Sequence, residues 1–176
     1  MIAFSLEPRE LRKSVNKFLK MAVVLTGAYM VYKVICLIAN TSTPVVVVLS
    51  GSMEPAFQRG DILLMWNRGS RVNIGNIVVY DIKNRAIPIV HRVLRSHSSD
   101  RKQLVLTKGD NNPVDDLNLY DYKQMYLDRQ LDINGGYVWG YFPWLGYATI
   151  FLTDYPQART VLIGFSLLMA MFEAES

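Results

Sequence analysis

Residues 45–55 read VVVVLSGSMEP, and this stretch decides the fold. Its run of valines favours a β-strand, because β-branched side chains fit a pleated, half-buried surface. The run ends at Ser50-Gly51-Ser52, a corner of small residues of the kind that separates strands. The sequence therefore predicts either an ordinary turn or a serine, Ser52, whose hydroxyl is presented as a nucleophile at the edge of a sheet.

The same pattern of strands and turns continues along the chain. Short runs rich in Val and Ile occupy residues 45–49, 62–66, 77–82, 87–94 and 104–107. Gly, Pro, Asn and Asp separate these runs at roughly 8–15 residues, and no long amphipathic helix intervenes. An aromatic-rich segment, residues 137–152, continues the pattern and is bent by Gly and Pro. We therefore expect a mainly β domain with an antiparallel or mixed sheet.

Composition favours an association with a membrane. Of the 176 residues, 51% are hydrophobic and 19% are charged, whereas soluble domains have about 25% charged residues. The net charge of +4 is modest and much of the excess lies near the N-terminus, so it does not indicate a nucleic-acid partner. The single cysteine, Cys36, excludes a disulfide within this sequence and a cysteine-rich metal site.

Residues 21–39 form the best candidate for a membrane span. They comprise 19 residues whose only charge is Lys33, and a helix of that length spans about 28 Å, close to the thickness of the hydrocarbon core. The alternatives are the buried helix of a soluble domain and a cleaved secretory signal. Leu37 and Ile38 precede Ala39, so no small-x-small cleavage site forms there. A signal anchor is favoured.

Flanking charges predict the orientation of this anchor. Five cations precede the span, namely Arg9, Arg12, Lys13, Lys17 and Lys20, whereas residues 40–58 contain no Lys or Arg. By the positive-inside rule the N-terminus faces the cytosol and the rest of the chain lies on the other side. Near the C-terminus, residues 161–172 are uncharged but too short to cross a bilayer. They suit either an interfacial helix or a core helix.

A serine nucleophile needs a base, and the chain has two histidines. His91 lies in an apolar strand, where an unpaired imidazole is costly to bury, and His97 lies in what reads as a solvated turn. His91 is therefore the better candidate, although a lone histidine in such a strand is more often part of the core. A serine–lysine pair is the other option, but Lys83 lies in an exposed-looking turn and Lys108 offers no clear buried site.

An acid that orients the imidazole is expected in residues 107–116, TKGDNNPVDD. A calcium loop starting at Asp110 fails, because its sixth position is Asp115 where a glycine is needed. A plain polar turn stays open, and spacing does not choose among Asp110, Asp115 and Asp116. An adhesion motif at Arg59-Gly60-Asp61 is disfavoured, because the tripeptide is common by chance and introduces a strand.

Four segments in this order closely resemble the family of catalytic subunits of the eukaryotic endoplasmic-reticulum signal peptidase complex. They are SGSMEP at residues 50–55, GD at 60–61, IPIVHR at 87–92 and TKGDNN at 107–112. The resemblance, which includes the preceding anchor, covers most of the chain. It implies a signal-peptidase-like β catalytic domain with an N-terminal transmembrane helix and a short C-terminal apolar helix.

The resemblance also implies roles for individual residues. Ser52 matches the nucleophile, and His91 matches the general base, where bacterial relatives have a lysine. Asp116 matches the orienting acid. Ser50 matches a position that helps to bind the oxyanion, and Asp110 matches a position that supports the site. No metal or other cofactor is implied.

The function implied is that of a membrane-bound serine endopeptidase, which removes signal peptides from nascent secretory and membrane proteins during translocation. Accessory membrane subunits, pre-proteins, the lipid bilayer and the translocon are the expected partners. The expected location is the endoplasmic-reticulum membrane, as a single-pass type II protein with a lumenal catalytic domain. The expected regions are a basic cytosolic segment at 1–20, the anchor at 21–39, the catalytic domain at 40–156 and a membrane-associated helix at 157–176. A non-enzymatic anchored β domain is the rival, but it would need none of Ser52, His91 and Asp116.

Overall fold

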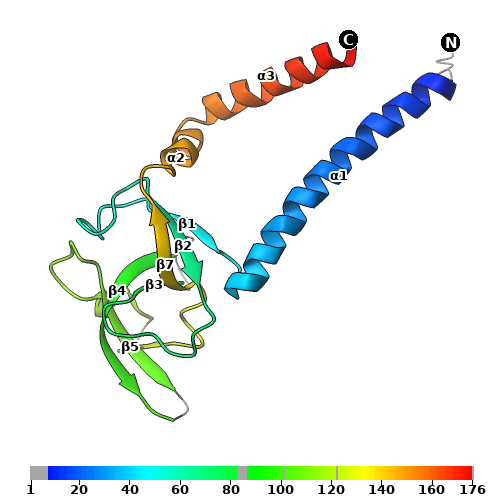
Figure 1. The fold of residues 1–176 in the computed structure, drawn as a ribbon. Coiled ribbons are helices and arrows are strands. Elements are labelled where there is room, and N and C mark those ends of the chain that lie inside the picture. Colours follow the sequence, from blue (N-terminus) through cyan, green and yellow to red (C-terminus); the bar gives the residue numbers. More distant parts are fainter. Residues whose placement is uncertain (1–7, 83–86, 101, 122, 176) are drawn as a thin grey trace. The chain divides into compact units, whose positions relative to one another are not determined.

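The computed structural model describes residues 8–82, 87–100, 102–121 and 123–175 (Figure 1). The chain forms two compact units, Met1–Ala39 and Asn40–Ser176. The first unit contains helix α1, Pro8–Ala39. Its segment Leu11–Ala39, with a mean hydropathy of 2.0 over an 18-residue window, is the one helix in the described ranges that is long and apolar enough to cross a membrane. Its 29 residues correspond to about 43 Å of helix.

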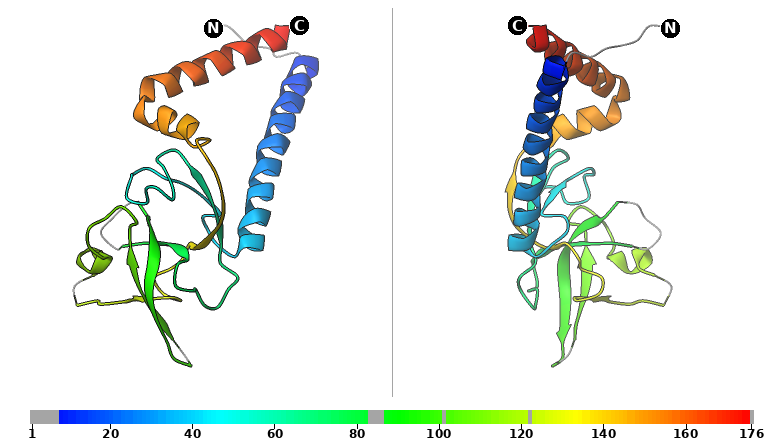
Figure 2. Two further views of the ribbon diagram at one scale, coloured as in Figure 1. Left: turned by 60° about the vertical axis from the view of Figure 1, so that its left-hand side comes forward. Right: turned by 90° about the vertical axis from the view of Figure 1, so that its right-hand side faces the viewer.

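The second unit is built on a seven-stranded antiparallel sheet with the order β1-β2-β7-β3-β4-β5-β6. The strands are β1 Val45–Val47, β2 Ile62–Trp66, β3 Ile77–Tyr80, β4 Ile89–Ser98, β5 Gln103–Lys108, β6 Leu127–Asp128 and β7 Gly136–Phe142. A 3₁₀ turn, η1, covers Asp116–Leu119, and two helices follow the sheet, α2 Tyr147–Asp154 and α3 Pro156–Glu175 (Figure 2). The expected mainly β fold, with an N-terminal helix and a short C-terminal apolar helix, is confirmed.

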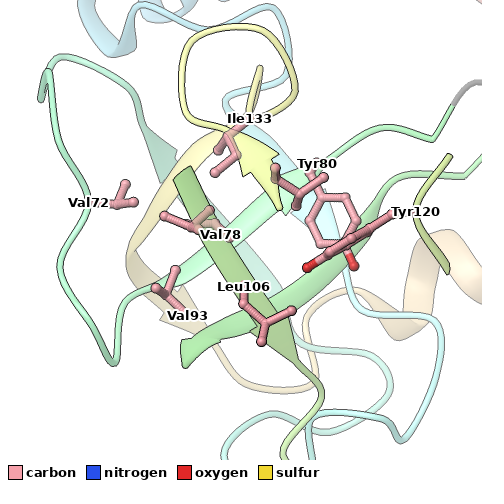
Figure 3. Packing of buried hydrophobic residues seen from close by; sticks show 9 residues of the cluster. Val72, Val78, Tyr80, Val93, Leu106, Tyr120 and Ile133 are labelled. Carbon is pink, nitrogen blue, oxygen red and sulfur yellow. The ribbon is translucent and has the colours of Figure 1, made fainter. Parts of the chain in front are cut away.

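Strand β3 is buried on both faces, and this explains its continuous apolar sequence. Because successive side chains of a strand point to opposite faces, Val78 and Tyr80 enter one hydrophobic cluster and Ile77 and Val79 enter another. The first cluster is shown in Figure 3, where the Tyr80 ring lies beside that of Tyr120. The sheet therefore has a packed layer on each side of its centre.

Two segments differ from the expectation. Strand β4 continues to Ser98, so the exposed His97 lies in a strand of the long β4–β5 hairpin and not in a turn. The aromatic segment at residues 137–152 is only partly extended, because helix α2 begins at Tyr147. Its β-branched and aromatic residues favour strands, but Gly146 packs against the Gly60 carbonyl and turns the chain into a helix there.

Candidate active site

The register of the sheet brings polar side chains to one face. His91 lies opposite Val78 on β3, and Val93 lies opposite Thr107 on β5. Side chains directly opposite each other, and those two residues apart, share a face. Tyr80, His91 and Thr107 therefore lie on the same side of the sheet, although at least ten residues separate each from the next along the chain.

Of the three candidate acids, Asp116 is the one beside the imidazole. Its carboxylate Oδ2 is 2.6 Å from Nδ1 of His91, and only 1% of the residue is exposed. Asp115 caps the η1 turn, where its side chain accepts from the Leu117 amide at 3.4 Å. Asp110 forms a two-pronged ion pair with Arg92, at 2.8 and 2.6 Å. The structure thus gives the three aspartates three different partners.

Ser52 lies on the other side of the imidazole. Its Oγ is 3.2 Å from Nε2 of His91 and 3.3 Å from Oγ of Ser50. The corner at Ser50-Gly51-Ser52 thus places one hydroxyl within hydrogen-bonding distance of His91 and a second hydroxyl next to the first. Both ring nitrogens of His91 thus have side-chain partners, a carboxylate at Nδ1 and a serine at Nε2.

The loop after β5 holds the serine corner in place. The Asn111 amide donates to the Ser52 carbonyl at 2.9 Å, and its side chain donates to the Gly51 carbonyl at 3.1 Å. A Cβ at Gly109 would lie 2.7 Å from the same Ser52 carbonyl oxygen, closer than real contacts allow. Only glycine permits this approach. Sequence reasoning did not assign Asn111 or Gly109 a role, although both belong to the TKGDNN segment.

The Asp116 carboxyl is ionised in this setting. Burial acts to raise its pKa, but hydrogen bonds from His91 and Thr107 outweigh burial, and the pKa lies below the usual value of 3.8. An ionised carboxylate only accepts hydrogen bonds, so Nδ1 of His91 carries the proton. With Nδ1 protonated, a neutral imidazole presents Nε2 as the acceptor for the Ser52 hydroxyl. This is the protonation state in which an imidazole can act as a base toward serine.

Two tyrosines that the sequence did not single out belong to this cluster, one bonded to the carboxylate and the other to Thr107. Tyr80 donates its hydroxyl to Oδ2 of Asp116 at 3.0 Å, and Tyr120 bonds Thr107. Burial raises the pKa of both phenols, that of Tyr120 to about 12. Both phenols are therefore neutral hydrogen-bond donors at physiological pH.

An apolar groove of about 920 Å³ opens beside Ser52 and His91. The strand residues 45–49 form one wall, residues 87–90 form another, and Thr149, Ile150 and Thr153 of α2 also line it. The outer edge of β1 has no strand beside it within the described sheet, because β1 lies at the end of the strand order. An extended chain could pair with that edge.

The other candidate bases are placed elsewhere. Lys108 lines a separate hollow with Arg92 and Asp110, and Lys83 lies outside the described residues. His97 packs its ring edge-on against Tyr126, with centroids 5.2 Å apart. In the described ranges of the chain, no group of three His, Cys, Asp or Glu side chains could hold a metal ion.

A serine hydroxyl, an imidazole and a buried carboxylate in hydrogen-bonded series, next to an apolar groove, are the arrangement of a serine peptidase. No model of a known protein family matches the chain. Individual relatives do match. The signal peptidase complex catalytic subunit SEC11 of Candida tropicalis is 52% identical over 165 residues, which cover 94% of this chain and 99% of the relative.

Two further relatives with the same description agree with this match. The subunit of Yarrowia lipolytica is 50% identical over 167 residues, covering 95% of this chain and 96% of its own length. That of Debaryomyces hansenii is 53% identical over 155 residues, covering 88% and 92%. The chain belongs to the family of signal peptidase complex catalytic subunits, and it is a serine peptidase.

Proposed function

We propose that this subunit removes N-terminal signal peptides from secretory and membrane proteins entering the endoplasmic reticulum, with Ser52 as nucleophile, His91 as general base and Asp116 as orienting acid. The observation that carries the proposal is the unbroken series from Ser52 Oγ through both nitrogens of His91 to Asp116, at 3.2 and 2.6 Å. Proton transfer requires such distances.

The chemistry follows from the proton positions. Ser52 attacks the carbonyl carbon of the scissile peptide bond while Nε2 of His91 takes the hydroxyl proton. The tetrahedral intermediate collapses as His91 returns that proton to the leaving amine, and an acyl-enzyme remains on Ser52. Water, deprotonated by His91, then attacks the ester, and His91 returns this proton to Oγ of Ser52 as the ester bond breaks and the second product is released. Asp116 stabilises the imidazolium formed in each half of the reaction.

The developing oxyanion needs donors close to Ser52. The Ser52 amide donates to no other acceptor in the described part of the chain, and the Ser50 hydroxyl is next to the nucleophile. Both are therefore available to the oxyanion, and one such donor is typically worth about 3–4 kcal/mol in the transition state. The loss of kcat in Ser50→Ala measures how much the Ser50 hydroxyl contributes to stabilising the oxyanion.

The groove supports a substrate that is apolar and extended. Among the described strands, none pairs with the outer edge of Val45–Val47, and the lining of the groove is mainly aliphatic. We propose that the segment around the cleavage site pairs with this edge and places small side chains in the groove. Val46→Asp, which puts a charge in the groove wall, should weaken cleavage of such substrates by raising KM.

Asp110 supports the site through Arg92, the residue after His91. The ion pair joins β4 to the loop that carries Asn111 and leads to Asp116. Hydrogen bonding to Asp110 raises the pKa of Arg92, as expected for a charge-assisted pair. In this proposal Asp110 positions the general base and the serine corner relative to each other.

The proposed setting is a type II membrane protein. Helix α1 serves as the anchor, its basic first half faces the cytosol and the β domain is lumenal. The accessory subunits of the complex, the bilayer and the translocon are the proposed partners, and α3 associates with the membrane. The four proposed regions are residues 1–20, 21–39, 40–156 and 157–176.

Processing of a pre-protein in vitro tests the proposal. Complexes assembled with Ser52→Ala or His91→Ala should lose cleavage by several orders of magnitude, because the nucleophile or its base is absent. Asn118→Ala, a change on η1 outside the groove lining, is the control and should cleave at the normal rate. Normal cleavage by either active-site variant would refute the assignment.

A further inference from the structure

The hydrogen bonds to Asp116 converge on one of its two oxygens. Oδ2 accepts from His91 at 2.6 Å, from the Thr107 hydroxyl at 2.6 Å and from the Tyr80 hydroxyl at 3.0 Å. The other oxygen, Oδ1, is buried and has no partner among the described residues. The side chains that hold the carboxylate therefore act on the same atom that faces the imidazole.

The directions of the hydrogen bonds around Thr107 are fixed by chemistry. An ionised carboxylate cannot donate a hydrogen bond, so the Thr107 hydroxyl donates its only proton to Asp116. In the 2.9 Å contact between Thr107 Oγ1 and the Tyr120 hydroxyl, the tyrosine is then the donor and the threonine oxygen is the acceptor. The Tyr120 oxygen in turn accepts from the Thr107 amide at 2.9 Å. A directed chain runs from the Thr107 amide through Tyr120 and the Thr107 hydroxyl to Asp116.

We propose that Thr107 is a positioning residue of the peptidase, which uses this Tyr120-assisted hydroxyl to hold Oδ2 of Asp116 against His91. The inference rests on the proposed roles of Asp116 and His91. Thr107 does not touch the substrate groove and acts only through the carboxylate.

Burial makes the contribution of Thr107 large. Thr107 is 0% exposed and Asp116 is 1% exposed, so water cannot replace a lost donor. A hydrogen bond to a charged group is stronger in such surroundings, and a donor that is itself polarised by another hydrogen bond is stronger still. Loss of the hydroxyl would leave Tyr80 and His91 to hold Oδ2.

The affected property is the proton balance between Asp116 and His91. With one donor fewer, the negative charge on Oδ2 is less well stabilised and interacts more strongly with the imidazolium form of His91. The imidazole–carboxylate pair therefore releases this proton less readily. The pair then stays in its inactive, protonated form up to a higher pH. The acidic limb of the kcat/KM profile should move upward, and kcat should fall while KM changes little.

The decisive variants are Thr107→Val and Thr107→Ser in the assembled complex, assayed on one pre-protein across the pH range. Valine has the shape of threonine without the hydroxyl, and it should lower kcat by roughly 10- to 100-fold, by analogy with the loss of a partner that orients a metal ligand. Serine restores the hydroxyl and should return both kcat and the acidic limb toward the wild type. Thr41→Val is the matched control, because it removes another buried hydroxyl that donates to the Asn134 carbonyl and not to Asp116.

Tyr120→Phe provides a second measurement if Thr107→Val does not fold. It leaves the Thr107 hydroxyl in place but removes the donor behind it, so the acidic limb should move in the same direction by a smaller amount. Unchanged kcat and an unchanged pH profile in these variants would overturn the inference. A lower kcat with an unmoved acidic limb, not rescued by serine, would also overturn it and would indicate a packing role.

Asp116→Asn separates this inference from the proposed function. If Asp116→Asn is inactive while Thr107→Val behaves as wild type, the site stands and only the positioning role fails. If Asp116→Asn cleaves normally, the proposed acid itself is wrong. The pattern expected is inactivity of Asp116→Asn, intermediate activity of Thr107→Val and normal activity of Thr107→Ser and Thr41→Val.

Discussion

Asp116 and Arg129 are both buried in the β domain, and their charges are satisfied in opposite ways. Asp116 is surrounded by hydroxyl and imidazole donors that all reach one oxygen. Arg129, which is 5% exposed, is surrounded by neutral oxygen acceptors. Its guanidinium donates to the Ile133 carbonyl at 3.2 Å, to the Gly69 carbonyl at 2.9 Å and to the side chain of Asn67.

Neither charge follows the usual rule that a buried ion is paired with a full counter-ion. No carboxylate of the described residues lies within ion-pair distance of Arg129, and burial lowers the pKa of its guanidinium. Asp116 faces the imidazole of His91, which is a counter-ion only when it is protonated. Dipoles stabilise both charges, but only the Asp116 cluster contains a partner that changes its protonation in the proposed mechanism.

The difference lies in what each cluster connects. Arg129 joins the loop after β2 to the turn before β7, and Asn134 in that turn also accepts from Thr41, near the start of the domain. Its acceptors are carbonyl groups, which have one protonation state. The Asp116 cluster joins three strands to the groove through His91. We infer that the first cluster supplies stability and the second supplies reactivity, and each of the following experiments can break this contrast.

The largest effect is expected for Asp116→Asn. The amide cannot stabilise an imidazolium and favours the wrong tautomer of His91, so kcat should fall by about 10³- to 10⁴-fold, as for the equivalent change in other serine peptidases. The free energy of unfolding should change by only about 1–2 kcal/mol, because most contacts remain. Single-turnover cleavage and thermal unfolding of the same preparation provide both values. A stability loss without a kinetic loss would reverse the roles assigned to the two clusters.

Arg129→Met should have the opposite profile. Methionine fills similar space but leaves three acceptors without donors, and we expect the free energy of unfolding to fall by about 2–4 kcal/mol. At temperatures well below the transition, kcat should stay within about twofold of wild type, a change of about 0.4 kcal/mol in the barrier. Arg71→Met, a change at an exposed arginine, is the matched control and should affect neither quantity. A large kinetic loss in Arg129→Met would show that the two clusters are coupled.

The sequence predicted the strands better than it predicted these clusters. Runs of apolar residues rich in Val and Ile mark β1 to β5. In β3 the run is continuous because both faces of this strand are buried. Ser52 and His91 could be chosen from residue type, since the chain has few nucleophiles and bases in apolar surroundings. Asp116 could not be separated from Asp110 and Asp115 by spacing, and only the resemblance to a family selected it.

Tyr80, Thr107 and Tyr120 were beyond sequence reasoning for a physical reason. Their convergence depends on the register between β3, β4 and β5, including an irregularity between Val93 and Arg95 that no local pattern reveals. Arg129 was missed because arginine in a polar turn is normally exposed. Local propensity determines which residues form strands, whereas contacts between segments far apart in the sequence determine the partners of a buried charge.

A smaller and purely thermodynamic contrast concerns acid stability. The pKa of Asp116 is lower in the folded chain than the usual 3.8, so its ionised form stabilises the fold above that value. This stability is lost as the pH falls through the folded pKa, and each pKa unit of difference is worth about 1.4 kcal/mol. Thermal unfolding from pH 7 to pH 3 should show wild type losing its advantage over Asp116→Asn. The difference between wild type and Arg129→Met should stay constant over this range, because the guanidinium remains protonated.

The smallest effect is expected where a charge pair lies at the surface. Arg59 and Asp154 are 3.0 Å apart, but each side chain is 50% exposed, so water screens their attraction. Asp154 is also the last residue of α2, where a negative charge opposes the helix dipole and offsets part of the gain. Asp154→Asn should therefore change the free energy of unfolding by at most about 0.5 kcal/mol, and the change should shrink further in high salt. A loss above about 1 kcal/mol that survives high salt would mean that direct ion pairing, and not burial among oriented dipoles, stabilises the charges of this domain.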